Sequence, residues 1–184
     1  MAAPDAELAA LEARLPAAPL REEAVYARLR ALGIAWKTYE HAPVFTVEQS
    51  QSLRGVVPGG HTKNLFLKDR RDGLWLVVCR ENARIDLKAL AKEMGQQRFS
   101  FGSGELLVET LGVPPGSVTP FALMNDAPPR VTAILDEKMM AQELLNFHPL
   151  RNDRTTAIAA SDLVRFIRAT DHEPRILALP EVAP

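Results

Sequence analysis

The chain has 184 residues, 47% of them hydrophobic, which fits one globular domain with a substantial core. Its formal net charge of −1 argues against a broad nucleic-acid clamp, because neutralising many phosphates requires a surplus of Lys and Arg. No apolar run approaches the ~20 residues needed to cross a bilayer, and the alanine-rich start is acidic, unlike a secretory signal. We therefore expect a cytoplasmic protein that does not bind membranes.

Helical spacing of apolar residues predicts an amphipathic helix within residues 19–34, and Gly33 is its expected stop signal. Thr46, followed three residues later by Gln49, has the pattern of a capping box, so a second helix is expected from Val47 to Gly55. The remaining expected helices cover 86–95, 103–112 and 161–170, with Asp86, Ser103 and Ser161 as their caps.

Apolar and β-branched segments bounded by turn residues predict the strands. They cover 35–41, 62–68, 74–80, 130–139, 145–150, 155–160 and 175–179. A hairpin connection at 69–73 joins the second strand to the third, and the Pro-rich segment 113–126 is expected to be an ordered loop leading into a strand or short helix. Strands and helices interleave irregularly, which favours an α+β single domain with a mixed sheet.

The single cysteine, Cys79, excludes an internal disulfide and a cysteine-cluster metal site. Its apolar neighbours indicate a small buried side chain. The four histidines show no metal-like spacing, so we expect neither a metal nor a cofactor. Charge is unevenly distributed: residues 61–98 hold nine basic and five acidic residues, whereas 99–184 hold seven and eleven. The middle of the chain therefore suits a small anionic partner or one end of a polyanion, although an ordinary solvated surface explains the same charges.

Lys63 stands at the start of a predicted strand, ahead of mostly apolar residues. Alternate side chains of a strand share a face, so Lys63 points to the same side as Leu65 and Leu67. Such a lysine either extends its amine into solvent or meets an anion, and a compact ammonium suits a phosphate or a developing negative charge. Asn64 lies on the opposite face of the strand. Its side chain either contacts a ligand or forms hydrogen bonds with the backbone of a loop.

The segment "GVPPGSVTP" is a second candidate. Pro-Pro-Gly fits a tight turn in which Gly116 takes a positive φ. The backbone N–H groups of Ser117, Val118 and Thr119, ahead of Pro120, would then form a concavity for an anion or an oxyanion. A rigid loop that only connects two elements, without binding a ligand, would show the same residues.

His148 precedes a proline, which restricts its backbone to extended geometry. It either recognises a substrate amine, limits the depth of a pocket, or is an ordinary histidine of the core or surface. No nucleophile motif is present: the chain has neither G-x-S-x-G nor S-x-x-K, and no local motif supports a dyad of Ser117 with Lys63.

Taken together, "HTKNLFLKD", "GVPPGSVTPFALMND" and "LNFHPL" resemble the YbaK-like aminoacyl-tRNA deacylases, relatives of the editing domain inserted in bacterial prolyl-tRNA synthetases. The similarity covers about residues 20–180 and is strongest to the free-standing proteins that remove alanine from tRNA for proline. It implies a mixed, mainly antiparallel, barrel-like sheet with surrounding helices. It also implies a single deacylase domain over 20–184 after an extension, residues 1–19, that is either disordered or helical.

The resemblance also implies roles for individual residues. Lys63 would contact the phosphate and aminoacyl end of the terminal adenosine, and Gly116–Pro120 would hold the ester through backbone groups. His148 matches the histidine associated with alanine specificity. We therefore expect Lys63 and Gly116 to be catalytic. The expected substrate contacts are Phe45, Thr46, Asn64, Ser117, Val118, Thr119, Pro120 and His148.

The implied activity is trans-editing: hydrolysis of the ester of mischarged Ala-tRNA(Pro), with the acceptor end of tRNA as partner and prolyl-tRNA synthetase as a further candidate partner. An aminoacyl ester is already activated, so positioning a water and stabilising the oxyanion suffice. A synthetase site built for proline rejects the smaller alanine poorly, because each missing methylene lowers the binding free energy by only ~1–3 kcal/mol. A second, smaller pocket that excludes proline would complete the discrimination.

Other functions stay open. One is a deacylase of the same family that acts on tRNA charged with cysteine or serine. Another is a non-catalytic module that binds tRNA ends or nucleotides and regulates. A plain structural domain would leave the orientation of Lys63 and the proline-rich loop unexplained. Deacylation of differently charged tRNAs separates these hypotheses.

Overall fold

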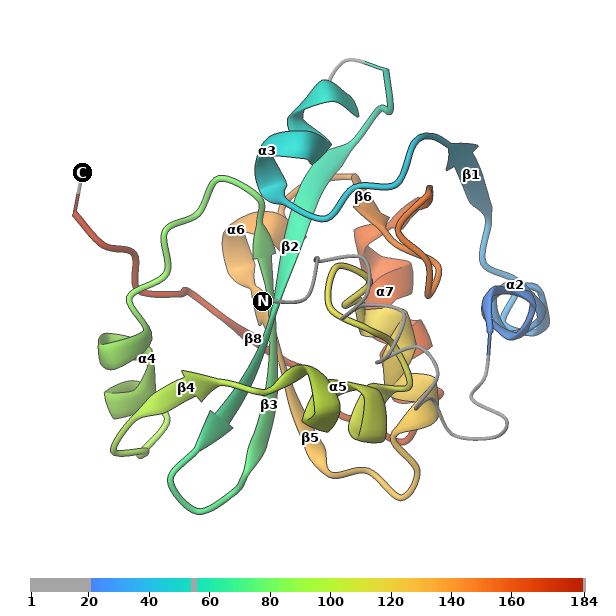
Figure 1. Cartoon of the computed structure of the whole chain (residues 1–184). Coiled ribbons are helices and arrows are strands. Elements are labelled where there is room, and N and C mark those ends of the chain that lie inside the picture. The colour runs from blue at the N-terminus through green and yellow to red at the C-terminus, as the bar shows by residue number, and fades with distance from the viewer. Residues whose placement is uncertain (1–20, 54–55, 184) are drawn as a thin grey trace, which may run out of the picture.

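The structure, a computed structural model, describes residues 21–53 and 56–183, so the extension expected over 1–19 lies outside the described residues. Its centre is a mixed eight-stranded sheet (Figure 1). The strands are β1 (Trp36–Glu40), β2 (Gly60–Asp69), β3 (Leu74–Arg80), β4 (Phe99–Phe101), β5 (Val131–Asp136), β6 (Leu144–Phe147), β7 (Arg154–Ala159) and β8 (Arg175–Leu177). The predicted α+β class with a mixed sheet is thereby confirmed.

Strand β2 connects the two halves of this sheet. The strand order is β1-β7-β6-β2-β3-β5-β8, and β4 pairs with β2 outside this path. β3 runs antiparallel along one edge of β2. On the other edge, β6 pairs only at Gly60 and His61 and β4 only at Leu67–Asp69. Within the described chain no strand pairs with this edge between His61 and Leu67. Gly102 N donates to Phe66 O at 2.9 Å, so the open part of the edge lies between Thr62 and Phe66.

Short helices surround the sheet. They are α2 (Glu22–Ala31), α3 (Val47–Ser50), α4 (Leu87–Glu93), α5 (Gly104–Leu111), α6 (Glu137–Met140) and α7 (Ala160–Arg168), with 3₁₀ turns η1 (Gln51–Leu53) and η2 (Pro120–Asn125). The predicted side-chain caps Thr46, Asp86 and Ser103 are all found, because each accepts a backbone N–H of its helix's first turn. The Thr46–Gln49 capping box is complete.

Several boundaries differ from the predictions for local reasons. The cap predicted at Ser161 is wrong: α7 follows β7 directly, its N-cap is Ala159, and no side chain caps it. β5 ends at Asp136 because that carboxylate accepts Lys138 N and begins α6. β6 ends at Phe147, ahead of Pro149, which has no N–H for a ladder. The three-residue strand β4 was not predicted.

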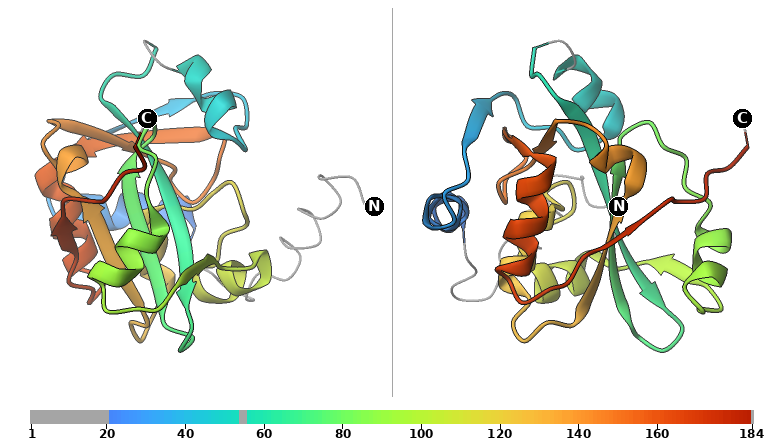
Figure 2. Two further views of the ribbon diagram at one scale, coloured as in Figure 1. Left: turned by 90° about the vertical axis from the view of Figure 1, so that its left-hand side faces the viewer. Right: turned by 180° about the vertical axis from the view of Figure 1, so that it is seen from behind.

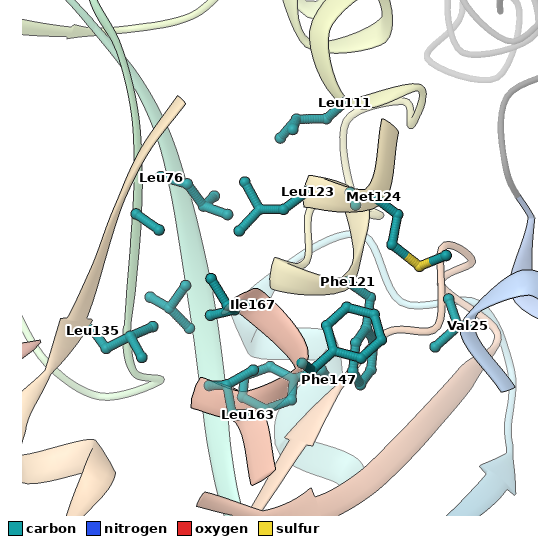
Figure 3. Packing of buried hydrophobic residues seen from close by; sticks show 14 of the residues in the cluster. Val25, Leu76, Leu111, Phe121, Leu123, Met124, Leu135, Phe147, Leu163 and Ile167 are labelled. Carbon is teal, nitrogen blue, oxygen red and sulfur yellow. The ribbon is translucent and has the colours of Figure 1, made fainter. Parts of the chain in front are cut away.

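The β2–β3 hairpin separates two apolar clusters. The larger contains Phe121 next to Phe147 (Figure 3). The Phe121 ring packs edge-on against the rings of Phe147 and Phe166, with centroids 5.8 and 4.9 Å away. The smaller lies on the opposite face and contains Leu67 and Trp75. Helix α7 covers the first side of the central strands and α4 the second (Figure 2). Both faces of the hairpin are therefore buried, and the open edge of β2 is the part of the strand left for a site.

In residues 21–53 and 56–183, none of the helices has the length and apolar character needed to cross a membrane. In the same part of the chain, no three His, Cys, Asp or Glu side chains gather closely enough to hold a metal ion.

A buried carboxylate, Asp126, fixes the chain before β5. Asp126 is 1% exposed and accepts hydrogen bonds from His172 Nε2 at 2.9 Å and from the backbone N–H groups of Arg130 and Val131 at 2.8 Å. Burial alone would raise the pKa of Asp126, but these hydrogen bonds hold it below its ordinary value. The carboxylate therefore stabilises the fold only while it is ionised.

We expect Asp126→Asn to lower the free energy of unfolding by about 3 kcal/mol at pH 7, because the variant loses a buried charge-assisted contact. A carboxylate with a lowered pKa contributes stability above its unfolded pKa of about 4 and loses it as pH falls through the folded value. The gap between wild type and variant should thus narrow on acidification. Denaturant unfolding at pH 7 and at pH 3 measures the difference in free energy of unfolding between wild type and variant. A difference that does not shrink at pH 3 contradicts a stabilising role of the ionised Asp126 carboxylate.

Candidate functional site

A cavity of about 210 Å³ has β2 in its wall, at the strand's open edge. Seven of the ten residues predicted for the site line this cavity. The lining residues are Val44, Phe45, Thr46, Val47, Thr62, Lys63, Asn64, Gly116, Val118 and His148. They come from the segment before α3, from β2, from the turn after α5 and from the end of β6. We call this space the main cavity.

Lys63 is half-buried and stands directly opposite Cys79 in the β2–β3 ladder. Leu65 and Leu67 lie opposite Val77 and Trp75, so the three β2 residues share a face, as predicted. Lys63 makes no ion pair within the described chain. An ammonium beside a cavity and without a carboxylate partner is available to an anionic ligand.

Phe45 and Thr46 form one wall of the main cavity. The Gln49 side chain accepts hydrogen bonds from the backbone N–H of Phe45 at 2.7 Å and of Thr46 at 3.3 Å, which fixes the chain ahead of α3. The Phe45 ring is 47% exposed, an unusual position for a phenylalanine. It offers an aromatic face at the rim of the cavity.

Gly116 forms the facing wall in a turn closed by the hydrogen bond from Ser117 N to Pro114 O at 3.1 Å. Its φ of +90° confirms the predicted positive value and matches the third residue of a type II turn. A Cβ at this position would lie 3.3 Å from Phe45 Cδ1. The positive φ therefore favours glycine, and a Cβ here would push the Phe45 ring by a few tenths of an ångström.

Three residues predicted to contact substrate do not line the main cavity. Ser117 is buried, and because its N–H closes the turn it is not free to hold an anion. Thr119 is fully buried and accepts Phe121 N through its side chain, which caps η2, and the buried Pro120 is the first residue of that turn. A Ser117–Lys63 dyad is not formed, since the two residues line different cavities.

Ser117 faces a larger cavity of about 550 Å³, the outer cavity, on the far side of the same turn. Its wall includes a charged network: Glu22 Oε1 accepts hydrogen bonds from Arg151 at 3.1 Å and from Arg154 at 2.9 Å. Arg151 also pairs with Asp153 at 2.6 Å. The turn from Pro114 to Val118 thus separates two cavities.

His148 is held at the end of β6 by a hydrogen bond from its Nδ1 to the carbonyl of Arg154 at 2.9 Å. A carbonyl only accepts, so Nδ1 carries the proton and Nε2 is an acceptor in the neutral ring. Burial lowers the pKa of His148 below its ordinary value, and the nearby His41, with ring centroids 6.3 Å apart, lowers it further. The ring is therefore neutral at pH 7.

An inner cavity of about 40 Å³ adjoins the main one, and Thr62, Asn64 and His148 line both. Asn146 also lines the inner cavity, and its only signal in the sequence is its place in "LNFHPL". The side-chain Oδ1 atoms of Asn64 and Asn146 are buried and have no hydrogen-bond partner in the described part of the chain. Thr62 Oγ1 donates to Asn146 O at 2.7 Å and ties β2 to β6 here.

Comparisons with known proteins agree with this geometry. The sequence model of the family described as "Aminoacyl-tRNA editing domain" matches residues 41–166, which include every residue lining the main cavity. The chain belongs to this family.

Relatives of this editing domain carry related names. A protein of Danio rerio called "Prolyl-tRNA synthetase associated domain-containing protein 1" is 37% identical over 152 residues, covering 82% of this chain and 83% of that protein. "Prolyl-tRNA editing protein ProX" of Acetoanaerobium sticklandii is 30% identical over 159 residues, covering 86% and 97%. These matches place the chain among the prolyl-tRNA editing relatives that the sequence resembles.

The fold is shared with a solved structure described as "Crystal structure of a putative trans-editing enzyme for prolyl tRNA synthetase". It superposes with a TM-score of 0.69 at 18% identity and covers 88% of this chain and 97% of that one. At this identity the match speaks for the fold alone.

Among the described residues that line the main cavity, no hydroxyl or thiol is activated as a nucleophile. The hydroxyl of Thr62 donates a hydrogen bond to Asn146 O, and that of Thr46 caps α3. Cys79 is fully buried, and burial raises the pKa of its thiol to about 12.

The buried thiol makes a direct prediction. We expect Cys79 in the native protein to resist a thiol-alkylating reagent at pH 8, because almost no thiolate forms and the sulfur is not exposed. The same reagent should label one thiol per chain in denaturant. Mass spectrometry of the two samples measures the difference, and rapid native labelling would show that the cysteine is accessible.

Gly116 can be tested against a matched control. Gly116→Ala and Gly33→Ala each place a side chain at a positive φ, but the Cβ at Gly33 has nothing within 4 Å. Both variants should lose about 1–2 kcal/mol of stability through left-handed strain. Only Gly116→Ala should also impair ligand binding or turnover, because its Cβ pushes Phe45. Thermal melts and deacylation rates separate the two effects, and equal activity losses would contradict the role of Gly116.

Proposed function

We propose that this editing domain hydrolyses the ester of alanyl-tRNA specific for proline, acting in trans on tRNA that a synthetase has released. The observation that carries the proposal is the main cavity itself. There Lys63, which has no ion-pair partner among the described residues, shares the cavity with the Gly116 turn, with Phe45 and with the neutral His148. The family and the names of the relatives support tRNA editing in general. Alanine as the amino acid is our own step.

The proposed reaction is the addition of a water to the ester carbonyl. The water oxygen forms a bond to the carbonyl carbon, and the bond from that carbon to the ribose oxygen breaks. One proton of the water passes to the departing ribose oxygen. The ester is already activated, so positioning and charge stabilisation provide the acceleration. This chemistry agrees with a cavity whose two lining threonines, Thr46 and Thr62, use their hydroxyls in structural hydrogen bonds, while the single cysteine lies outside the lining.

Lys63 and Phe45 would hold the terminal nucleotide. An ammonium group binds a phosphate or stabilises a developing oxyanion as a point charge. Exposed aromatic rings stack on bases in single-stranded RNA, each stack contributing ~1–3 kcal/mol. With Phe45 at the rim and Lys63 beside the cavity, the terminal adenosine would lie across the mouth and its ester would point inward.

Selectivity for alanine would come from the inner end of the main cavity. The main cavity is lined by Val44, Val47 and Val118, and it joins the small inner cavity at Thr62, Asn64 and His148, where the space narrows. A narrow end accepts a methyl group and excludes the ring of proline by overlap. Steric exclusion supplies the discrimination that a larger synthetase site lacks.

We expect Lys63→Ala to lower kcat/KM for alanyl-tRNA(Pro) by about 10²–10³-fold, the usual effect of removing one group that stabilises developing charge. Lys63→Arg should restore only part of the rate, because a planar guanidinium does not replace a compact ammonium. Lys68→Ala is the control, since Lys68 lies on the same strand and pairs with Asp72 at 2.9 Å. Single-turnover deacylation of the three variants measures these effects, and an undiminished rate for Lys63→Ala refutes the role.

The substrate is tested by a panel of tRNA(Pro) charged with alanine, cysteine, serine or proline. We expect fast deacylation of the alanyl ester and the slowest deacylation of the prolyl ester, because the narrow end excludes the ring. A preference for the cysteinyl or seryl ester would reassign the substrate within the family. Binding of uncharged tRNA without turnover of any ester would refute the hydrolase and favour a regulator.

A further inference from the structure

Phe101, the last residue of β4, has an exposed aromatic ring that the proposed reaction does not use. It is 65% exposed, and it neither belongs to one of the two apolar clusters nor packs against them. Phe99, two residues earlier on the same face of the strand, is buried and packs against Trp75 with ring centroids 5.1 Å apart. A single exposed apolar side chain is common, so the surroundings of Phe101 decide whether it has a role.

The backbone of Phe101 is held in a fixed position. Phe101 stands opposite Leu67 in the β2–β4 ladder, at the end of β2 that lies away from α3 (Figure 1). The N–H of the next residue, Gly102, donates to Phe66 O at 2.9 Å. A Cβ at Gly102 would lie 2.5 Å from Phe66 Cδ1, so glycine permits this close approach. The ring is therefore presented from a rigid strand, which lowers the entropy lost when a ligand binds to it.

Phe101 lies on the same face of the sheet as Lys63. Residues directly opposite each other in an antiparallel pair share a face, so Phe101 shares the face of Leu67 and, with it, of Leu65 and Lys63. Four residues of a strand span about 13 Å, which is the separation of Lys63 from Leu67 along β2. About two to four nucleotides of a single strand cover this distance. The half-buried Leu65 lies between the two ends.

Arginines without carboxylate partners lie beside β4. A cavity of about 200 Å³ at the β2–β3 hairpin is lined by Lys68, Asp69, Arg70, Asp72, Arg98 and Ser100. Asp69 already accepts three hydrogen bonds within the hairpin, and Asp72 pairs with Lys68 at 2.9 Å. Arg70 and Arg98 make no ion pair within the described residues. Positive charge beside an exposed ring favours a polyanion with aromatic bases over an apolar protein surface.

We propose that Phe101 is a positioning residue whose ring stacks on one of the two cytidines that precede the terminal adenosine in the single-stranded 3′ end of the tRNA. The inference rests on the proposed function, in which Phe45 and Lys63 hold the terminal nucleotide. The RNA strand leaves the main cavity, follows the open edge of β2 past Leu65 and presents a base to Phe101. Its phosphates continue toward Arg98.

The two exposed phenylalanines of the described chain, Phe45 and Phe101, then hold two different bases. Every base has an aromatic face, so stacking holds the strand without reading its sequence. A strand held at two points aligns the ester with Lys63, and small errors in such alignment lower the rate strongly. Phe101 thus acts through the position of the substrate and does not touch the reacting atoms.

The test combines a protein variant with a modified substrate. Alanyl-tRNA(Pro) is prepared intact and with an abasic nucleotide in place of either cytidine, which removes the base and keeps the phosphate. In wild type, one of the two abasic substitutions should lower kcat/KM about tenfold. Phe101→Leu, which keeps an apolar side chain and removes the ring, should lower kcat/KM for the intact substrate about tenfold as well. Phe101→Trp, which keeps a ring, should stay within about twofold of wild type.

The deciding quantity is the effect of both changes together. If the Phe101 ring and the base contact each other, Phe101→Leu combined with that abasic substrate should lower kcat/KM by about tenfold, whereas independent effects would multiply to about a hundredfold. Phe45→Leu is the matched comparison. The Phe45 ring is assigned to the terminal adenosine, so the effect of Phe45→Leu should multiply with that of the abasic cytidine.

Ile176→Ala is the inert control, because Ile176 is 47% exposed and lies on β8 at the far edge of the sheet. It should have wild-type rates on all substrates, and thermal melts establish that each variant is folded. The stacking contact is overturned, with the deacylase intact, by an undiminished rate of Phe101→Leu on the intact substrate, by wild-type rates that ignore both abasic substitutions, or by a hundredfold combined loss. Failure of wild type to hydrolyse intact alanyl-tRNA(Pro) overturns the proposed function and this inference together.

Discussion

The site depends on one interruption in strand pairing. β2 is bonded along one edge by β3, but on the other edge β6 and β4 cover only its two ends. Residues between these pairings keep the rigidity of a central strand while one side stays uncovered. Consecutive residues such as Thr62, Lys63 and Asn64 therefore line the same space although their side chains alternate between faces. A fully paired strand would have filled that space with a neighbour.

The walls of the main cavity suit the proposed substrate. Within the described residues the lysine of this cavity has no ion-pair partner, and it would face the phosphate and the carbonyl oxygen of the ester. An aminoacyl ester of RNA carries these two groups within a few bonds of each other. The ester would lie against the wall that the Gly116 turn and Phe45 form.

Local signals in the sequence were sufficient for much of the fold and for most of the site. The capping pattern at Thr46, the positive φ at Gly116 and the shared face of Lys63 and Leu65 each follow from the chemistry of a few adjacent residues, and each is found. Asn146 was not predicted as a site residue, because its role depends on carbonyls of Pro58 and Gly60 some 86–88 positions away. The N–H of Ser117 was predicted to bind an anion, but it donates to Pro114 O and closes the turn. The residue types of this segment do not reveal that hydrogen bond.

The walls of the main cavity come from segments spread between Val44 and His148, and the strand that holds His148 in place, β7, lies later still. No continuous fragment contains the whole constellation. A nascent chain leaving the ribosome would therefore have no competent site until β7 has emerged and paired with β6. The proposed activity would begin only after β7 has been made, and a shorter nascent chain would not compete for charged tRNA.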